Sequence, residues 1–305
     1  MFEKAASKFS FVGHFKVFVV ISAILCSIGL AGIILTFFNV PAFNLDLDFV
    51  GGVSMEMELG TPVTREVQES IEKIYTDVAG VTANVTTSGN SGTAVIVKTV
   101  EIPSEQREEV FNKVAELYGK DKTVLLNSGF VSANVGNDLK RSAFLASALA
   151  AVLILVYISI RFEFRSGLAA IICLLHDVLV MLSFFVIFRI PMNMTFIAAA
   201  LTIIGYSINA TIVVFDRVRE NYKRQGSGGD FSLVVDKSIW QTMRRSIGTT
   251  FTTLLPIILI CILGVTSIRI FALPLMVGVL AGGYSSTCIA GPLWNKFKGI
   301  GKGGK

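Results

Sequence analysis

The sequence predicts an α-helical membrane protein with six transmembrane helices and a small α+β domain of ferredoxin-like plan between the first and second helices. Of its 305 residues, 52% are hydrophobic and only 16% are charged, whereas soluble domains average about 25% charged residues. Six apolar segments are each long enough to cross a bilayer as a helix. The one long polar stretch, residues 40–140, lies between the first and second of these segments.

The apolar segments place the membrane helices. The first segment follows the basic residues 1–15, but it exceeds 20 residues and lacks the small-residue cleavage site of a secretory signal. We therefore interpret it as a membrane helix. Residues 216–246 are predicted as a loop and residues 293–305 as a tail. The six helices are expected at residues 16–38, 142–161, 167–188, 191–215, 247–265 and 270–292.

The distribution of Lys and Arg predicts the orientation of these helices. Basic residues gather in the N-terminal stretch, in the turn at 161–165, in loop 216–246 and in the tail, whereas the opposite short loops contain only Arg189 and Arg269. Loops rich in Lys and Arg remain in the cytoplasm. Both termini and loop 216–246 are therefore expected to be cytoplasmic, and residues 40–140 extracytoplasmic.

Residues 40–140 have the pattern of a small α+β domain. Thr61 is expected to cap the first helix, with Pro62 in its first turn and Gly80 after its end, and Ser104 to cap the second helix. The order strand-helix-strand-strand-helix-strand is the split βαβ plan of ferredoxin-like domains. The domain contains no nucleophile–base pair, which argues against an enzyme site. Strands are expected at residues 52–59, 81–87, 93–100 and 123–131, and helices at residues 62–79 and 104–118.

The fourth membrane helix carries the most informative polar residues. Gly205, Ser207 and Asn209 lie inside an apolar run that ends abruptly at Asp216. Polar groups at mid-depth in a bilayer are costly and tend to face other helices or a hydrated path. Two interpretations stay open, a transport path and a helix–helix contact made by small residues and an amide.

A second polar feature, His176 followed by Asp177, lies near the middle of the third helix. A carboxylate at the bilayer centre costs about 2.5–3.5 kcal/mol on insertion scales, and histidine changes protonation near neutral pH. The pair is either proton-responsive or a satisfied buried pair that fixes helix packing. No third ligand is close in the sequence, which argues against a metal site. Arg244 and Arg245, before the fifth helix, fit a positive-inside anchor.

Glycines mark two further places. Gly278 and Gly282 form a GxxxG pattern in the sixth helix, for which close helix packing is the expected use. Asp48 is followed by Gly51 and Gly52, which predicts a tight turn into the first strand, since a calcium loop would need more oxygen ligands. The four cysteines lie in apolar runs without CxxC spacing and are expected to be free thiols.

Together these motifs resemble the SecF family of bacterial protein-export membrane subunits, which is related to the RND transporters. The resemblance covers nearly the whole chain, and the Gly-Tyr-Ser-Ile-Asn and His-Asp motifs are its most specific part. Asp216 and Arg217 match the family's cytoplasmic end of the fourth helix, and Arg245 its arginine before the fifth. The motifs are DFVGG (48–52), RFEFRSGLAA (161–170), HD (176–177), GYSINATIVVFDRVREN (205–221) and QTMRRSIGTTFTTLL (241–255).

The resemblance implies a function and partners. SecF pairs with SecD, and the two form a twelve-helix RND-type unit in the bacterial cytoplasmic membrane. That unit associates with the SecYEG channel and the SecA motor. It uses the proton motive force to help translocate and release the exported polypeptide. No cofactor is implied, and the sequence lacks the GxxxxGK[ST] phosphate loop of an ATPase.

One residue departs from the family pattern. The family sequence is GYSINDT, and this chain has Ala210 in place of the acidic residue, which is implicated in proton relay. Alanine cannot bind a proton. Three explanations stay open: SecD supplies the essential carboxylate, Asp177 takes part, or the chain is an altered, coupling-defective form. The remaining candidates for relay or coupling are His176, Asp177, Ser207, Asn209 and Arg245.

Two alternative functions are weighed against export coupling. One is an RND-type exporter of small molecules or lipids, which would need a roomy apolar cleft in the outer domain. The other is a scaffold whose outer domain binds emerging polypeptides by edge-strand pairing or an apolar patch. Nucleic-acid binding is a poor explanation, because the positive charges cluster at membrane edges. An intramembrane enzyme is disfavoured, because no Ser–His pair or HExxH occurs in the predicted spans.

Overall fold

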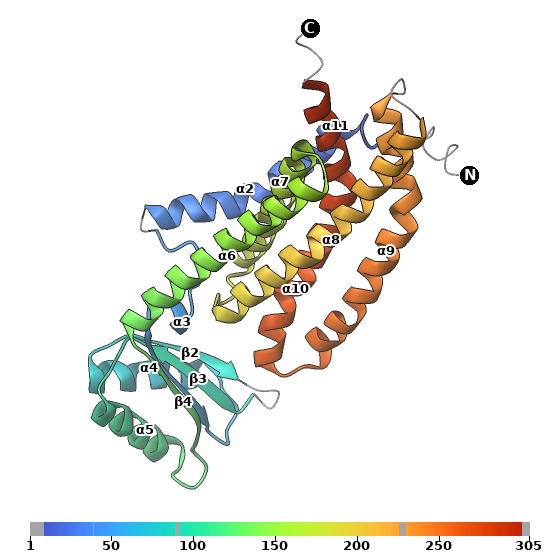
Figure 1. The fold of residues 1–305 in the computed structure, drawn as a ribbon. Coiled ribbons are helices and arrows are strands. Elements are labelled where there is room, and N and C mark those ends of the chain that lie inside the picture. Colours follow the sequence, from blue (N-terminus) through green and yellow to red (C-terminus); the bar gives the residue numbers. More distant parts are fainter. Residues whose placement is uncertain (1–8, 39, 89–91, 226–229, 301–305) are drawn as a thin grey trace. The chain divides into compact units, whose positions relative to one another are not determined.

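The computed structural model describes residues 9–38, 40–88, 92–225 and 230–300. The expected ends of the chain, 1–15 and 293–305, are thus described only in part. The chain divides into two compact units, a membrane unit of residues 1–44 and 145–305 and a soluble domain of residues 45–144 (Figure 1).

The soluble domain has the ferredoxin-like plan that its sequence predicts. Its four strands form one antiparallel sheet in the order β2-β3-β1-β4. Val53, Met55 and Met57 of β1 alternate with less buried residues and pack with Tyr75 in the core. Burial raises the pKa of the Tyr75 phenol, so its hydroxyl stays neutral beside Met55. The elements are α3 (Leu47–Val50), β1 (Gly52–Glu58), α4 (Arg65–Ala79), β2 (Ala83–Ser88), β3 (Ala94–Thr99), α5 (Ser104–Tyr118) and β4 (Val124–Val131).

Two predicted helix caps in this domain are wrong. Thr64, not Thr61, caps α4 by accepting a hydrogen bond from the backbone N–H of Val67, so Pro62 lies before the helix. Ser104 is the first residue of α5 rather than its cap. Several Ser, Thr and Pro residues near a helix start can satisfy the same sequence pattern, which explains both errors. Gly80 ends α4 in the left-handed conformation, as predicted.

The predicted tight turn before β1 contains a short helix, α3. Asp46 caps it, and the same carboxylate forms an ion pair with Lys98 on β3 at 2.6 Å. Gly51 and Gly52 follow with φ of 79° and 127°. A Cβ on Gly52 would lie 2.2 Å from the carbonyl oxygen of Thr99, so this position requires glycine.

The described residues contain six helices long and apolar enough to cross a bilayer, which confirms the predicted number. The sixth span is not one regular helix, because a six-residue π-helix, η1, joins α10 to α11. Proline lies inside α9 and α10. The elements are α2 (Phe15–Phe37), α6 (Ala133–Arg161), α7 (Phe164–Phe188), α8 (Met194–Gln225), α9 (Phe231–Leu263), α10 (Thr266–Tyr284), η1 (Ser285–Ala290) and α11 (Gly291–Ile300).

The connection predicted as a loop at 216–246 is helical at residues 216–225 and 231–246. Helix α8 continues to Gln225, and α9 already begins at Phe231. At 1.5 Å per residue, the 32 residues of α8 extend about 48 Å, well beyond the roughly 30 Å of a hydrocarbon core. The polar ends of both helices therefore continue past the apolar layer without a change of secondary structure.

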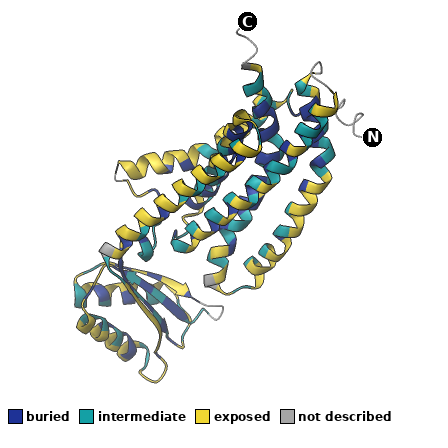
Figure 2. Cartoon of the chain, viewed as in Figure 1, coloured by how far each residue is buried: buried dark blue, intermediate teal, exposed yellow. Residues whose placement is uncertain are grey.

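Burial is unequal among the membrane helices. In α7 and in the sixth span 39% and 44% of the most apolar window is buried, against 11% in α2, α6 and α9. Figure 2 shows that α6 is exposed along most of its length and α9 along most of its C-terminal half. Helices α7, α8 and α10 with η1 thus form the interior of the unit, and α2, α6 and α9 present apolar surface suited to lipid or to another membrane protein.

Candidate functional site

A buried carboxylate, Asp177, lies at the centre of the membrane unit. Its side chain comes from α7 and is 1% exposed. The Oδ2 atom accepts hydrogen bonds from the hydroxyls of Ser207 on α8, at 2.5 Å, and Ser285 on η1, at 3.0 Å. The Oδ1 atom lies 2.9 Å from Nδ1 of His176. One carboxylate therefore joins three elements that are distant in the sequence.

Two glycines on α10 allow this helix to pack closely against α8. A Cβ on Gly282 would lie 3.0 Å from Cβ of Ser207, and a Cβ on Gly278 would lie 2.6 Å from Cγ1 of Ile203. Both contacts are closer than side chains normally reach, so α10 can pack this tightly against α8 only with glycine at these positions. The GxxxG pattern therefore has the packing use that the sequence predicts.

Polar contacts continue from this centre to α2. The His176 ring lies 5.8 Å from the ring of Tyr284. The Tyr284 hydroxyl donates to the carbonyl oxygen of Phe18 and accepts from the hydroxyl of Ser22, both on α2. The other ring nitrogen of His176, Nε2, is buried and has no hydrogen-bond partner within the described part of the chain.

The predicted site residues fall into two groups. His176, Asp177 and Ser207 come together in the buried centre. Asn209 and Arg245 are exposed instead, on α8 and α9, and do not contact that centre.

The other motif positions of α8 also lie outside the centre. Ala210 is half-buried, and Gly205 is exposed with open space beside it. Asp216 is exposed, while Arg217 donates to Gln241 of α9 and pairs with Glu220. Arg217 thus ties together the extended ends of α8 and α9.

Sequence reasoning missed three members of the buried centre: Ser285, Tyr284 and Ser22. Ser285 lies three residues after Gly282, on the same face of a regular helix, but the sequence does not show that this face meets Asp177. The π-helix that begins at Ser285 changes the helical register there. Neither that change nor the pairing of α2 with the sixth span has a signal in the sequence.

Metal binding has no support in the described residues. They contain no group of three or more His, Cys, Asp or Glu side chains placed to hold a metal ion. All four cysteines are free, and Cys26 and Cys173 lie near backbone carbonyl oxygens of His176 and Ser285. The centre is thus a set of hydrogen bonds around one carboxylate.

Comparison with known proteins relates this architecture to protein export. Residues 110–299 match the family model "Protein export membrane protein SecD/SecF, C-terminal". The chain is 37% identical to the protein translocase subunit SecF of Acidaminococcus fermentans, with 95% of this chain and 98% of that protein covered. It is also 37% identical to the protein translocase subunit SecDF of Bacillus subtilis, over 96% of this chain but only 38% of that longer protein.

A solved structure agrees with this relationship. The crystal structure of SecDF from Thermus thermophilus, a translocon-associated membrane protein, superimposes with a TM-score of 0.83 at 30% identity. It covers 95% of this chain, and this chain spans 39% of it. From the family match, the relatives and the shared fold, the chain belongs to the SecD/SecF family of protein-export membrane proteins and is a multi-pass bacterial membrane protein.

Proposed function

We propose that this chain acts in Sec-dependent protein export as a SecF subunit, paired with a SecD subunit that completes a proton-driven unit. Its relatives are translocase subunits, and in the fused SecDF of Bacillus subtilis the matching region is 38% of the protein. The remainder of the fusion corresponds to what a separate SecD would contribute. The SecYEG channel and the SecA motor are the further partners in this proposal, and the translocating polypeptide is the substrate.

One observation carries the proposal. Asn209 is exposed on α8 and Arg245 on α9, two membrane helices that pack against each other. Ala210, next to Asn209 in the sequence, cannot carry a proton. Polar and charged side chains are costly against lipid, so a surface that presents them requires a polar partner. We infer that this surface, defined by Asn209, Ala210 and Arg245, meets SecD and that SecD supplies the titrating carboxylate.

Asp177 has a different role in this proposal. Its carboxyl group is sealed from solvent by the chain's own helices and already has three hydrogen-bond partners. A proton relay group must exchange protons with both sides of the membrane, whereas a sealed group fixes geometry. Asp177 therefore holds α7, α8 and η1 in place beneath the surface that meets SecD.

Photo-crosslinking tests the pairing. The full chain, co-expressed with SecD from the same source, carries a benzoylphenylalanine at Asn209 in one variant and at Leu153 in another. Leu153 is exposed on α6 and serves as the matched control. We expect a crosslink to SecD from position 209 and little from position 153. Equal crosslinking from both positions, or a stable homodimer in native membranes, would contradict the proposal.

The fold also favours a second candidate, a scaffold that holds a polypeptide by strand pairing. Strand β4 is at the edge of the sheet and is exposed along almost its whole length, including Val124, Leu126 and Phe130. An exposed apolar edge strand is a template for pairing with another strand. Proton flux in vesicles that contain the full complex separates the candidates, because a pure scaffold conducts no protons.

A further inference from the structure

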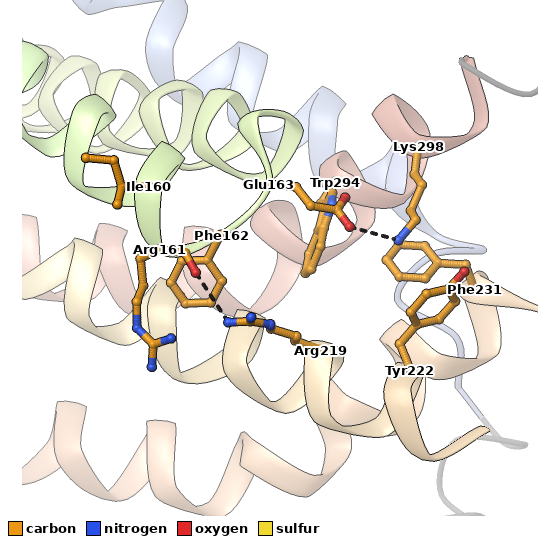
Figure 3. A pocket seen from close by; sticks show the side chains of 9 residues that line it. All are labelled: Ile160, Arg161, Phe162, Glu163, Arg219, Tyr222, Phe231, Trp294 and Lys298. Carbon is orange, nitrogen blue, oxygen red and sulfur yellow. Dashed lines mark hydrogen bonds and ion pairs between the residues drawn. The ribbon is translucent and has the colours of Figure 1, made fainter. Parts of the chain in front are cut away.

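We propose that the membrane unit contains a site for the phosphate group of an anionic phospholipid, in a pocket at the turn between α6 and α7. The pocket has a volume of about 260 Å³. Its walls come from the end of α6, the turn, α8, the start of α9 and α11 (Figure 3). The polar lining consists of Arg161, Glu163, Arg219, Tyr222, Trp294 and Lys298.

The lining favours an anion. Three of these residues are cationic and only Glu163 is anionic, so the local charge is +3 − 1 = +2. Glu163 does not fully neutralise Lys298, because their ion pair is long, at 3.5 Å. Arg219 donates one N–H to the carbonyl oxygen of Arg161, as Figure 3 shows, and its other N–H groups have no hydrogen-bond partner among the residues that the structure describes. Arginine binds phosphate through several parallel hydrogen bonds.

Aromatic residues hold the third cation in place. The Lys298 amino group lies 4.1 Å from the ring centre of Tyr222 and 4.3 Å from that of Phe231. Cation–π contacts at this range fix the position of an ammonium group. Trp294 also lines the pocket and is buried, which places a third aromatic side chain beside Lys298, with a ring centre 5.8 Å from its amino group.

The surroundings indicate a lipid rather than a soluble phosphate compound. Ile160 lines the pocket and is 82% exposed. Leu153, Val156 and Tyr157 are exposed on the same face of α6, since residues three, four and seven apart share a helix face. This apolar strip leads away from the pocket along α6 and suits acyl chains. The pocket itself is smaller than the roughly 300–1,000 Å³ of typical small-molecule sites, as expected for a headgroup phosphate alone.

The position of the pocket fits the membrane interface. The apolar run of α6 ends at Arg161, and the polar turn follows. Trp, Tyr and basic residues concentrate at the level of lipid headgroups, and basic pockets between membrane helices bind anionic headgroups. The basic pocket thus lies at the level of the headgroups, and the apolar strip on α6 lies at the level of the acyl chains. A phospholipid presents its phosphate and its chains in the same order.

Tryptophan quenching tests the site directly. The chain has two tryptophans, so in a Trp240→Phe background Trp294 is the single reporter. The full chain is reconstituted in phosphatidylcholine bilayers with increasing amounts of phosphatidylglycerol brominated near the headgroup end of its chains. We expect Trp294 quenching to half-saturate at a mole fraction at least fivefold lower than with brominated phosphatidylcholine. Equal quenching by the two lipids would overturn the proposal.

Charge variants make the test specific. Each basic residue near an anionic membrane surface contributes roughly fivefold in affinity, so Arg219→Gln and Arg161→Gln should each raise the half-saturating fraction about fivefold. Arg244→Gln, which removes an exposed cation on α9 outside the pocket, should leave it unchanged. Lys298→Gln also removes the aromatic contacts, so the conclusion depends on the two arginine variants. Unchanged quenching in both would refute the site.

Competition with inorganic phosphate shows whether the pocket binds the phosphate of a lipid or that of a soluble compound. Added to the brominated phosphatidylglycerol bilayers, it should reduce Trp294 quenching only weakly, because it lacks the acyl chains. If inorganic phosphate abolishes quenching at low concentration and binds equally well in pure phosphatidylcholine, the pocket takes a soluble phosphate compound and the lipid assignment is wrong.

Discussion

The hydroxyl of Ser285 donates to Asp177 across 3.0 Å, and Ser285 is also the first residue of the π-helix in the sixth span. The wider π-helical turn and the buried hydrogen bond therefore begin at the same residue. Single π-turns inside helices often occur at functional sites. Here the turn brings a donor from the sixth span to the carboxylate that also binds α8, so the irregular helix completes the buried centre.

Replacing Asp177 should destabilise the membrane unit without abolishing protein export. Asp177→Ala removes the acceptor of two buried hydroxyl donors and the partner of the His176 ring, at a cost of about 1–3 kcal/mol for each polar group that finds no new partner. Asp177→Asn keeps an amide oxygen and should cost less. Thermal unfolding in detergent measures both, with Asp216→Asn, an exposed carboxylate on α8, as the control.

Export assays complete this prediction. At matched amounts of folded protein, we expect Asp177→Asn to export at the wild-type rate, because the carboxylate fixes packing in our proposal. Lost proton-driven export with normal stability would instead place Asp177 on the proton path.

Two glycines, one on α8 and one on α10, should differ sharply in their tolerance of alanine. In Gly278→Ala the new Cβ would lie 2.6 Å from Ile203 and 2.9 Å from Met181, and such overpacking costs about 1–3 kcal/mol. Gly205→Ala meets no atom within 4 Å and should be neutral or stabilising by up to about 1 kcal/mol. An equal decrease in the melting temperature of the two variants would argue against close α8–α10 packing.

A third prediction concerns the entry to β1. Gly52→Ala combines a φ of 127° with a Cβ 2.2 Å from the Thr99 carbonyl oxygen, and strained backbone alone costs about 1–3 kcal/mol. We expect faster proteolysis and faster hydrogen exchange in β1 and β3 of the full chain. Gly129→Ala on β4 meets nothing within 4 Å and is the matched control, so an equal loss of protection in both variants would rule out backbone strain at Gly52 as the cause.

Ala210→Asp should leave export unchanged, because the proposal assigns the titrating carboxylate to SecD. The measurement is proton-driven export in vesicles that contain the variant with its SecD partner. Increased coupling would mean that position 210 is a lost relay site and that this chain is a coupling-defective form. A second variant, Ala210→Asn, separates the effect of charge from the effect of size.

The orientation can be tested with inserted epitopes. One follows Asp121, an exposed residue between α5 and β4, and the other follows Lys305. From the distribution of basic residues we expect an antibody to reach the first epitope in intact spheroplasts and the second only after permeabilisation. The reverse result would invert the membrane topology.

Much of the fold follows from local pattern. The strands and helices of the soluble domain lie within three residues of their predicted starts, because alternation and helical periodicity are local properties. The GxxxG contact and the buried His176–Asp177 pair also follow from short motifs. In each case neighbouring residues in the sequence contain the physical cause.

The predictions that were wrong or incomplete depend on contacts between residues far apart in the sequence or on the length of a helix. Residues 216–246 look like a loop because they are polar, yet α8 extends to Gln225 and α9 begins at Phe231. The Arg217–Gln241 hydrogen bond joins these two helix ends. Asn209 lies in the same motif as Ser207, but the helical turn points the two residues to different surroundings, one exposed and one buried. A motif places residues on one helix and does not assign them to one site.

The π-helix also affects how the sixth span can change in length. A residue inserted into a regular helix rotates all later residues about the helix axis by about 100°. Trp294 and Lys298 would then face a different direction relative to Gly278 and Gly282. The π-helix at 285–290 can accommodate such an extra residue, so that the side chains of α10 and α11 still face the same neighbours. The sixth span should therefore tolerate a single-residue deletion in this segment, for example of Thr287, better than one in the middle of α7.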